Sequence, residues 1–195
     1  MNRSPLALLA LLLAAALPPL LSACAPILVA GAAGGAALVA TDRRSTGAQV
    51  DDTTIETKVL TTAAGRYGDR IHLNVTSFNG VVLLTGEVPD AAVRSDIYAL
   101  ARGTDRVRAV HDELVVGPAT DLSARTNDTY ITSKVKTRFL EATDQFSATH
   151  VKVVTERRVV YLMGIVSRAE ADAAARIAAT TSDVARVVKL FEITG

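Results

Sequence analysis

Few residues in this chain have the types and spacings that catalysis requires. The three histidines, His72, His111 and His150, lie in separate segments and form no HxxxH or HExxH pattern of the kind that binds zinc. Asp51 and Asp52 form an acidic pair, but they precede a predicted helix, where an aspartate caps the first turn. No nucleophile stands beside a base that would activate it. We therefore expect a protein that is not an enzyme, with no catalytic residues, no metal site and no cofactor.

Cys24, the only cysteine, is the one residue whose setting implies a chemical modification. A basic start at Arg3 and an uncharged apolar run over 6–17 precede it, which is typical of a secretory signal peptide rather than a membrane span. Leu21-Ser22-Ala23-Cys24 resembles the bacterial lipobox. The resemblance implies that the thiol of Cys24 takes a diacylglyceryl group, that residues 1–23 are removed as a signal peptide, and that the freed amine is then acylated.

A lipidated Cys24 would attach the chain to a membrane. Each buried methylene contributes about 0.8 kcal/mol, so three acyl chains hold a protein there permanently. Ala25 directly follows the cysteine, and by resemblance to Gram-negative lipoproteins this favours sorting to the outer membrane. We expect a protein anchored to the outer membrane through Cys24 and facing the periplasm. Residues 24–50 are predicted to be the lipidated cysteine and an Ala/Gly-rich tether, either a flexible spacer or a weak helix at the membrane surface.

The composition behind this leader is that of an ordinary globular protein. The chain of 195 residues is 49% hydrophobic and 21% charged, and its 21 basic and 20 acidic side chains give a net charge of +1. This balance excludes a protein that coats a polyanion, so we expect no nucleic-acid partner, and the charged content argues against disorder. About 150 residues remain after the leader, enough for one domain or two small ones.

These remaining residues repeat one unit. Asp52–Val59 matches Asp128–Val135 at an offset of 76 residues, and Val81–Gly86 matches Val159–Gly164 at an offset of 78. A third block of apolar residues matches at an offset of 77, in the same order, which indicates a duplication. A turn-forming stretch separates the two copies. We therefore predict a first domain, a linker and a second domain over 51–117, 118–124 and 125–195.

Each unit is predicted to contain a helix, two strands, a helix and a strand, in that order. Asp52 and Asp128 are the predicted N-caps of the first helices. Asn79-Gly80 is typical of a tight type I′ hairpin turn, whereas its counterpart, Glu156-Arg157-Arg158, predicts a looser turn. Three short strands with both helices on one face make an α+β fold.

This pattern resembles a known family. Two such units behind a lipobox are similar to tandem BON domains, and the likeness is clearest in Gly47-Ala48-Gln49-Val50-Asp51-Asp52, Asn127 to Val135, and Leu162-Met163-Gly164. Gly86 and Gly164 take the places of the family's structural glycines, which permit a close backbone approach or a bend. The resemblance implies two αββαβ domains, each with a three-stranded sheet packed on two helices. It also implies no enzymatic activity and binding to phospholipid membranes, often anionic ones.

The resemblance to dual BON-domain lipoproteins further implies that the first helix of the second domain binds lipid. It also implies that the protein supports outer-membrane integrity. On a helical wheel, Tyr130, Lys134 and Thr137 lie opposite the apolar face of this helix, and Arg138 flanks them. A tyrosine beside cations suits the headgroup region of a bilayer. One departure is Tyr130 itself, where the family would place the bulkier Trp. The predicted phospholipid-binding residues are Tyr130, Lys134, Lys136, Thr137 and Arg138.

The charge of the two domains agrees with this assignment. Residues 42–120 carry 9 basic and 11 acidic side chains, and residues 121–195 carry 11 basic and 9 acidic. Two other interpretations stay open, because Tyr130 could pack against the other domain and the basic residues could form an ordinary solvated face. Two functions follow. One is a membrane-binding module that recognises anionic phospholipid, and the other is an interaction scaffold that docks on outer-membrane assembly, division-site or cell-wall partners.

Overall fold

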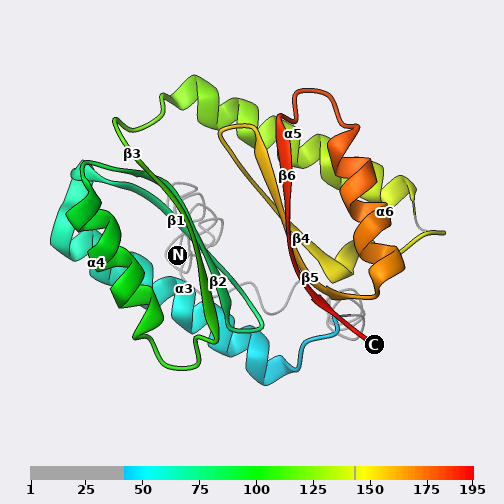
Figure 1. Cartoon of the computed structure of the whole chain (residues 1–195), viewed down its shortest axis with the longest axis horizontal. Helices are drawn as coiled ribbons and strands as arrows, with labels where there is room; N and C mark the ends of the chain where they lie inside the picture. The colour runs from blue at the N-terminus through cyan, green and yellow to red at the C-terminus, as the bar shows by residue number, and fades with distance from the viewer. Residues whose placement is uncertain (1–41, 143) are drawn as a thin grey trace, which may run out of the picture. The chain divides into compact units, whose positions relative to one another are not determined.

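The computed structural model describes residues 42–142 and 144–195, which form two domains of one plan (Figure 1). The expected signal peptide, Cys24 and the first part of the tether lie outside the described residues. The first domain contains α3 (Thr46–Tyr67), β1 (His72–Phe78), β2 (Val81–Val88), α4 (Ala91–Arg102) and β3 (Ala109–Val116). The second contains α5 (Leu122–Glu141), β4 (Val151–Glu156), β5 (Val159–Val166), α6 (Arg168–Ala179) and β6 (Arg186–Ile193). A short 3-10 helix precedes the first strand of each domain, η1 (Gly68–Arg70) and η2 (Ala148–His150).

The predicted α+β fold, helix, two strands, helix and strand, is confirmed in both domains. In the first sheet β1 and β2 form an antiparallel hairpin, and β3 lies parallel to β2 on its other side. The second sheet repeats this arrangement with β4, β5 and β6. A parallel pair cannot be joined by a tight turn, so the second helix of each domain serves as the crossover. Figure 1 shows α3 and α4 on one face of the first sheet, and α5 and α6 on one face of the second.

Each domain has its own core between its helices and its sheet. Ile55 and Val59 of α3 are buried there in the first domain. Ile131, Val135 and Phe139 of α5 are buried in the second. These residues recur every four positions, which places them on one side of a helix. The apolar helix faces predicted from the sequence are therefore the faces that pack on the sheets.

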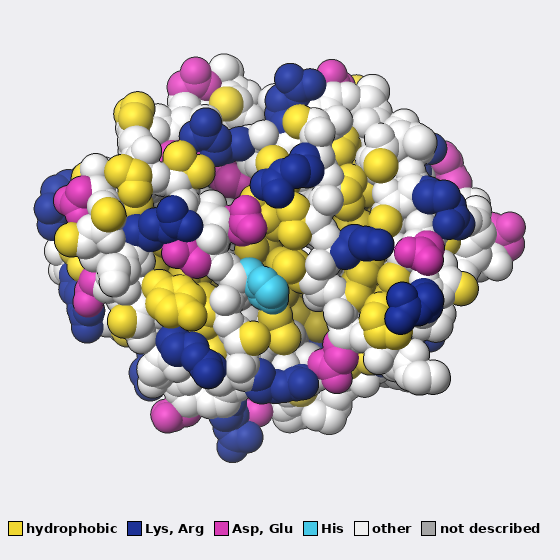
Figure 2. Space-filling view, in the orientation of Figure 1, with side chains coloured by type: hydrophobic (Ala, Val, Ile, Leu, Met, Phe, Trp, Pro, Cys, Tyr) yellow, Lys and Arg dark blue, Asp and Glu magenta, His cyan; other side chains and the backbone are white. Residues whose placement is uncertain are grey.

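The faces of the sheets that carry no helices pack on each other. Phe78 and Leu83 from the first sheet form one buried cluster with Tyr161 and Met163 from the second. Because successive strand residues point to opposite faces, Leu83 contacts the other sheet while its neighbours on β2 face their own helices. Figure 2 shows hydrophobic side chains reaching the surface in the middle of this view, among Lys and Arg side chains. Both domains thus belong to one compact unit.

The first helix of each domain begins earlier than the sequence predicts. Ser45 is the N-cap of α3 and accepts a hydrogen bond from the Ala48 amide at 3.1 Å. Asp121 caps α5 in the same way, at 2.8 Å from the Ala124 amide. The prediction that Asp52 and Asp128 are the N-caps is therefore wrong. Both lie inside their helices, and both are buried.

The two buried aspartates instead hold the hairpin turns. Asp52 accepts hydrogen bonds from the backbone amides of Asn79 and Gly80, at 2.7 and 2.8 Å. Asp128 accepts them from the amides of the two residues at the equivalent turn, both at 2.8 Å. An aspartate is as useful to exposed turn amides as to a helix start, because both present N–H groups without a backbone partner. Sequence pattern alone did not distinguish these two uses.

The turn between β4 and β5 is as tight as the turn between β1 and β2. Asn79 and Gly80 have φ angles of 51° and 74°, and Arg157 and Arg158 have φ angles of 52° and 63°. The prediction of a looser turn at 156–158 is therefore wrong. A pair of arginines adopts the left-handed conformation at a cost that Asn-Gly largely avoids. The two hydrogen bonds that Asp128 accepts from the amides of these arginines offset that cost.

The glycine of each middle strand sits where no side chain fits. Gly86 has a φ of 117°, and a Cβ there would clash with the carbonyl oxygen of His72 on the paired strand. A Cβ on Gly164 would clash in the same way with the carbonyl oxygen of His150. The close approach of the two strands in each hairpin therefore depends on these glycines.

Candidate functional site

The outward face of α5 carries three large hydrophobic side chains. Leu122, Tyr130 and Leu140 are 77%, 60% and 65% exposed. They lie opposite the core residues of the same helix and span about 27 Å of its length, at 1.5 Å per residue. A single exposed leucine is ordinary on a protein surface, but three on one helix face make a candidate contact surface. The exposure of Tyr130 also shows that it is not packed in the interface between the domains.

Hydroxyl side chains between these residues are satisfied within the helix. Thr126 donates to the Leu122 carbonyl at 2.8 Å, and Thr129 donates to the Arg125 carbonyl at 3.0 Å. Ser133 donates to the Thr129 carbonyl at 3.0 Å. A hydroxyl bonded four residues back in this way loses little when water is removed from the face. The outward face of α5 is therefore less polar than its composition suggests.

The structure brings together four of the five predicted site residues. Tyr130, Lys134, Thr137 and Arg138 line a shallow depression of about 540 Å³. The Lys134 Nζ lies 4.5 Å from the centre of the Tyr130 ring, as in a cation–π contact. Lys136 is exposed on α5, but it is not among the residues that line the depression. The other side of the depression, missed from the sequence, is formed after α6 by Thr180, Thr181 and Ser182.

Both cations of the depression have partners within their own domain. Lys134 Nζ lies 2.5 Å from a carboxylate oxygen of Asp183 and 2.8 Å from the hydroxyl of Ser182. The hydrogen bond from Lys134 lowers the pKa of Asp183, so this carboxylate is ionised at neutral pH. Arg138 donates from one nitrogen to the Ile177 carbonyl at the end of α6, at 2.8 Å. Lys134 therefore presents a neutralised charge, whereas the guanidinium of Arg138 keeps its own.

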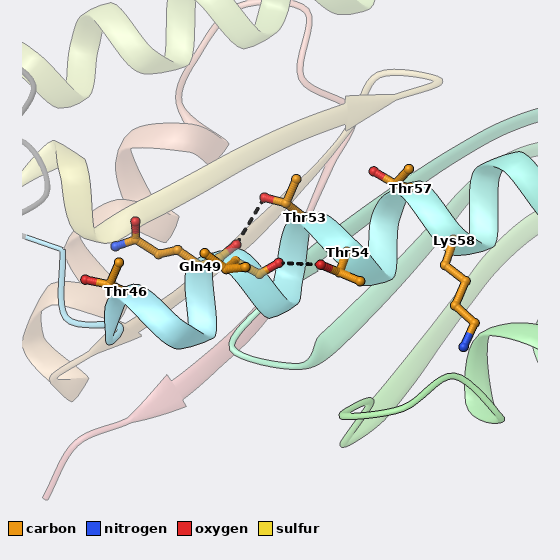
Figure 3. A pocket seen from close by; sticks show the side chains of 7 residues that line it. Thr46, Gln49, Thr53, Thr54, Thr57 and Lys58 are labelled. Carbon is orange, nitrogen blue, oxygen red and sulfur yellow. Dashed lines mark hydrogen bonds between the residues drawn. The ribbon is translucent and has the colours of Figure 1, made fainter. Parts of the chain in front are cut away.

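The equivalent face of α3 in the first domain is built from smaller residues. Val50, 61% exposed, is its one large hydrophobic side chain. Thr53 and Thr54 donate to the carbonyls of Gln49 and Val50 at 3.0 and 2.9 Å, as Figure 3 shows. Tyr130 has Thr54 as its counterpart, at the offset of 76. The α3 face thus shares the satisfied hydroxyls of α5 but lacks the aromatic ring.

None of the helices among the described residues is long and apolar enough to cross a membrane.

Comparison with known proteins agrees with this architecture. The family model described as "BON domain" matches residues 51–118 and 127–195. The chain is 39% identical over 165 residues to the outer membrane lipoprotein DolP of Haemophilus influenzae, covering 80% of this chain and 82% of that protein. It is 34% identical to the 21 kDa hemolysin of Actinobacillus pleuropneumoniae, over 77% of this chain and 78% of that one. It is also 34% identical to the osmotically-inducible protein Y of Escherichia coli, over 72% of each chain.

The chain therefore belongs to the BON-domain family, and its described residues form two αββαβ domains whose open sheet faces pack on each other. Within that family it is a dual BON-domain protein of the DolP type.

Proposed function

We propose that this protein is a non-enzymatic outer-membrane lipoprotein that binds anionic phospholipid through its second BON domain and supports the integrity of the cell envelope. The observation that carries the proposal is the outward face of α5. It joins exposed Leu122, Tyr130 and Leu140 with satisfied hydroxyls, and cationic groups flank it. A tyrosine ring with a polar tip suits the headgroup region, and leucines suit the acyl boundary beneath it.

Localisation rests on a different part of the chain. The relative from Haemophilus influenzae is named an outer membrane lipoprotein, and it shares 39% of its residues with this chain over the matched region. Leu21-Ser22-Ala23-Cys24 supplies the lipobox that such a protein needs. The proposal therefore gives Cys24 the role of a permanent anchor and leaves α5 the role of orienting the protein on the membrane.

The energies are consistent with that division of roles. A basic side chain near an anionic surface contributes about 1 kcal/mol, and burying a leucine contributes about 1.5–3 kcal/mol at most. Lys134 contributes less because Asp183 neutralises it, which leaves Arg138 and Lys136 as the principal cations. The resulting affinity is weak, and an acyl anchor makes a weak contact effective by raising the local concentration of the surface.

Vesicle co-sedimentation tests the proposal. The fragment 42–195 contains all the described cores and lacks the leader, so any binding comes from the globular part. We expect it to sediment with anionic vesicles, less so with zwitterionic ones, and less at higher salt. Tyr130→Ala should abolish this binding, whereas Thr54→Ala, the same position on α3, should not alter it. Equal binding of both variants and the wild type would overturn the assignment to α5.

A second candidate function is a periplasmic scaffold that docks on outer-membrane assembly or cell-wall proteins. The outward face of α3 favours it, because exposed Val50 lies among threonines whose hydroxyls are bonded within the helix, with Lys58 beside them. Such a face costs a protein partner little desolvation. A scaffold would lose a crosslink to its partner when Val50 is replaced by Glu and would keep its vesicle binding. A membrane-binding module would lose its vesicle binding when Tyr130 is replaced by Ala and would keep any crosslink to a protein partner.

A further inference from the structure

Three side chains that can bind a metal ion converge from the two domains. His72 stands on β1 and Glu87 on β2, while Glu156 stands at the end of β4 in the second domain. Their ligand atoms all lie within 4.8 Å of one another. The Nδ1 of His72 is 2.9 Å from a carboxylate oxygen of Glu87. Ligands of one metal ion lie about 3–4 Å apart when each bond is about 2.0–2.2 Å long, so small side-chain movements are enough.

The carboxylates of Glu87 and Glu156 are both buried. Glu87 is 1% exposed and Glu156 is 6% exposed, which is rare for glutamate unless it is paired or bound to a metal. The guanidinium of Arg157 lies 3.6 Å from Glu87 and is half-exposed, and Arg125 lines the same depression as His72 and Glu156. A divalent ion between the two buried carboxylates would add direct ligand bonds to this partial compensation.

The two glutamates respond differently to this burial. Burial alone would raise the pKa of Glu87, but hydrogen bonds from Thr120, at 2.5 and 3.0 Å, and from His72 bring it below the usual value. Burial raises the pKa of Glu156, which accepts from the Asn74 amide at 2.8 Å.

We propose that His72, Glu87 and Glu156 bind one divalent transition-metal ion of the zinc class between the two domains. One imidazole nitrogen and two carboxylate oxygens are a ligand set that Zn²⁺ accepts, and three protein ligands leave a fourth position for water. His72 and Glu156 also line a depression of about 230 Å³, which gives the ion a way in and the water a place.

The groups behind the ligands fit the same assignment. Thr120 belongs to the linker between the domains and fixes the carboxylate of Glu87 with two hydrogen bonds. Asn74 does the same for Glu156 with one. Outer partners of this kind orient metal ligands and raise affinity. An ion at this place would tie the linker and both sheets together, so its effect would be to rigidify the arrangement of the domains.

The duplication does not produce a second copy of this candidate metal site. His150 is the counterpart of His72, because each carbonyl oxygen faces the glycine of its neighbouring strand. Glu87 follows Gly86 on β2 and pairs with His72, whereas Ile165 follows the equivalent Gly164 on β5, so the second domain has no carboxylate at that position. The ligands at 72, 87 and 156 form no compact motif, which explains why the sequence predicts no metal.

Calorimetric titration of Zn²⁺ into the metal-free fragment 42–195 tests the proposal. We expect one ion per chain, and at least tenfold weaker binding in both His72→Ala and Glu156→Gln. His150→Ala is the matched control, since its side chain is 15% exposed against 16% for His72, and it should bind like the wild type. Circular dichroism checks the fold of each variant. If His72→Ala does not fold, the isosteric Glu156→Gln decides alone.

A second readout distinguishes this site from zinc on the surface. Because the ligands come from both domains, Zn²⁺ should slow amide hydrogen exchange in β1 and β4 together, and Glu156→Gln should remove the effect. X-ray absorption should report nitrogen and oxygen ligands at about 2.0–2.2 Å. The proposal is overturned if no ion binds at a ratio of one, or if Glu156→Gln leaves zinc affinity and exchange unchanged.

Discussion

The two domains share a backbone plan, but their first helices present different outward faces. In α3 the face is made of threonines around Val50, and in α5 the same face carries Leu122, Tyr130 and Leu140. The lysine is common to both: Lys58 lies 3.7 Å from Asp105, and Lys134 lies 2.5 Å from Asp183. The duplicated units therefore share the contacts that build the fold and differ in the residues exposed to a partner.

The same division appears at the hairpin turns. Both halves retain a buried aspartate under the turn, although one turn is Asn79-Gly80 and the other is Arg157-Arg158. In each turn the carboxylate accepts hydrogen bonds from backbone amides, which every residue except proline can donate, so the turn residues themselves are free to differ. The turn that tolerates two arginines should therefore depend more on its aspartate for its conformation.

Removal of these aspartates should have the largest effect on stability. Asp52→Ala is expected to cost about 3–5 kcal/mol, because it removes one of the two carboxylates that pair with Arg44 and leaves two turn amides unpaired. Asp128→Ala should cost about 2–4 kcal/mol. Urea denaturation measures both. Installing Asn-Gly at 157–158 should recover part of the second loss, and an unchanged midpoint there would contradict the idea that the aspartate supports the strained turn.

Replacing the strand glycines by alanine should have the second largest effect on stability. Gly86→Ala is expected to cost about 2–4 kcal/mol, because the new methyl meets the His72 carbonyl and the backbone keeps a φ of 117°. Gly164→Ala should cost less, since it meets the His150 carbonyl without a positive φ. Thermal unfolding of the two variants gives the comparison. Equal losses would mean that the clash alone, and not the backbone conformation, decides the effect.

Acid should weaken the second domain through Glu170. The hydrogen bonds from Arg43, at 2.8 and 2.9 Å, lower the pKa of Glu170 from 4.5 to about 2. The folded pKa lies below the unfolded one, so this contribution is complete above about pH 4.5 and is lost as the pH falls toward 2. An ion pair of this exposure contributes about 1–2 kcal/mol.

The measurement is the stability of wild type and Glu170→Gln between pH 2 and pH 7. The difference between them should shrink as the pH falls through this window. Asp183 offers the control, because its partner Lys134 belongs to a more exposed pair and Asp183→Asn should change stability little. A constant difference across the window would show that Glu170 acts through its hydrogen bonds in the capping box with Ser167 instead of through its charge.

The smallest expected effect is a gain in lipid binding. Asp183→Asn releases Lys134 from its ion pair and should strengthen binding to anionic vesicles about two- to fivefold, in line with about 1 kcal/mol for each freed cation. Asp105→Asn makes the same change beside Lys58 in the first domain and should have no effect on binding. Co-sedimentation at low salt compares them. An equal gain in both variants would show that lipid binding depends on the total charge of the protein and not on a contact made by α5.

The sequence by itself determined the repeat, the order of elements and the family. Apolar residues at every fourth position predicted the buried faces of α3 and α5, because a helix puts those positions on one side whatever surrounds it. The same periodicity predicted that Tyr130, Lys134 and Thr137 lie together opposite that buried face, and all three line one depression. Periodicity is a local property, and local properties can be read along the chain.

The tertiary structure alone decided which groups pair across the chain. From the sequence, Asp52 and Asp128 were predicted to cap helix starts. In the structure they accept hydrogen bonds from the hairpin turns, whose amides lie close in space but far away in sequence. The sequence also did not show that Asp183 neutralises Lys134, or that His72 and Glu87 meet Glu156 of the other domain. Electrostatic and hydrogen-bonded partnerships depend on distances of a few ångströms, and only packing sets those distances.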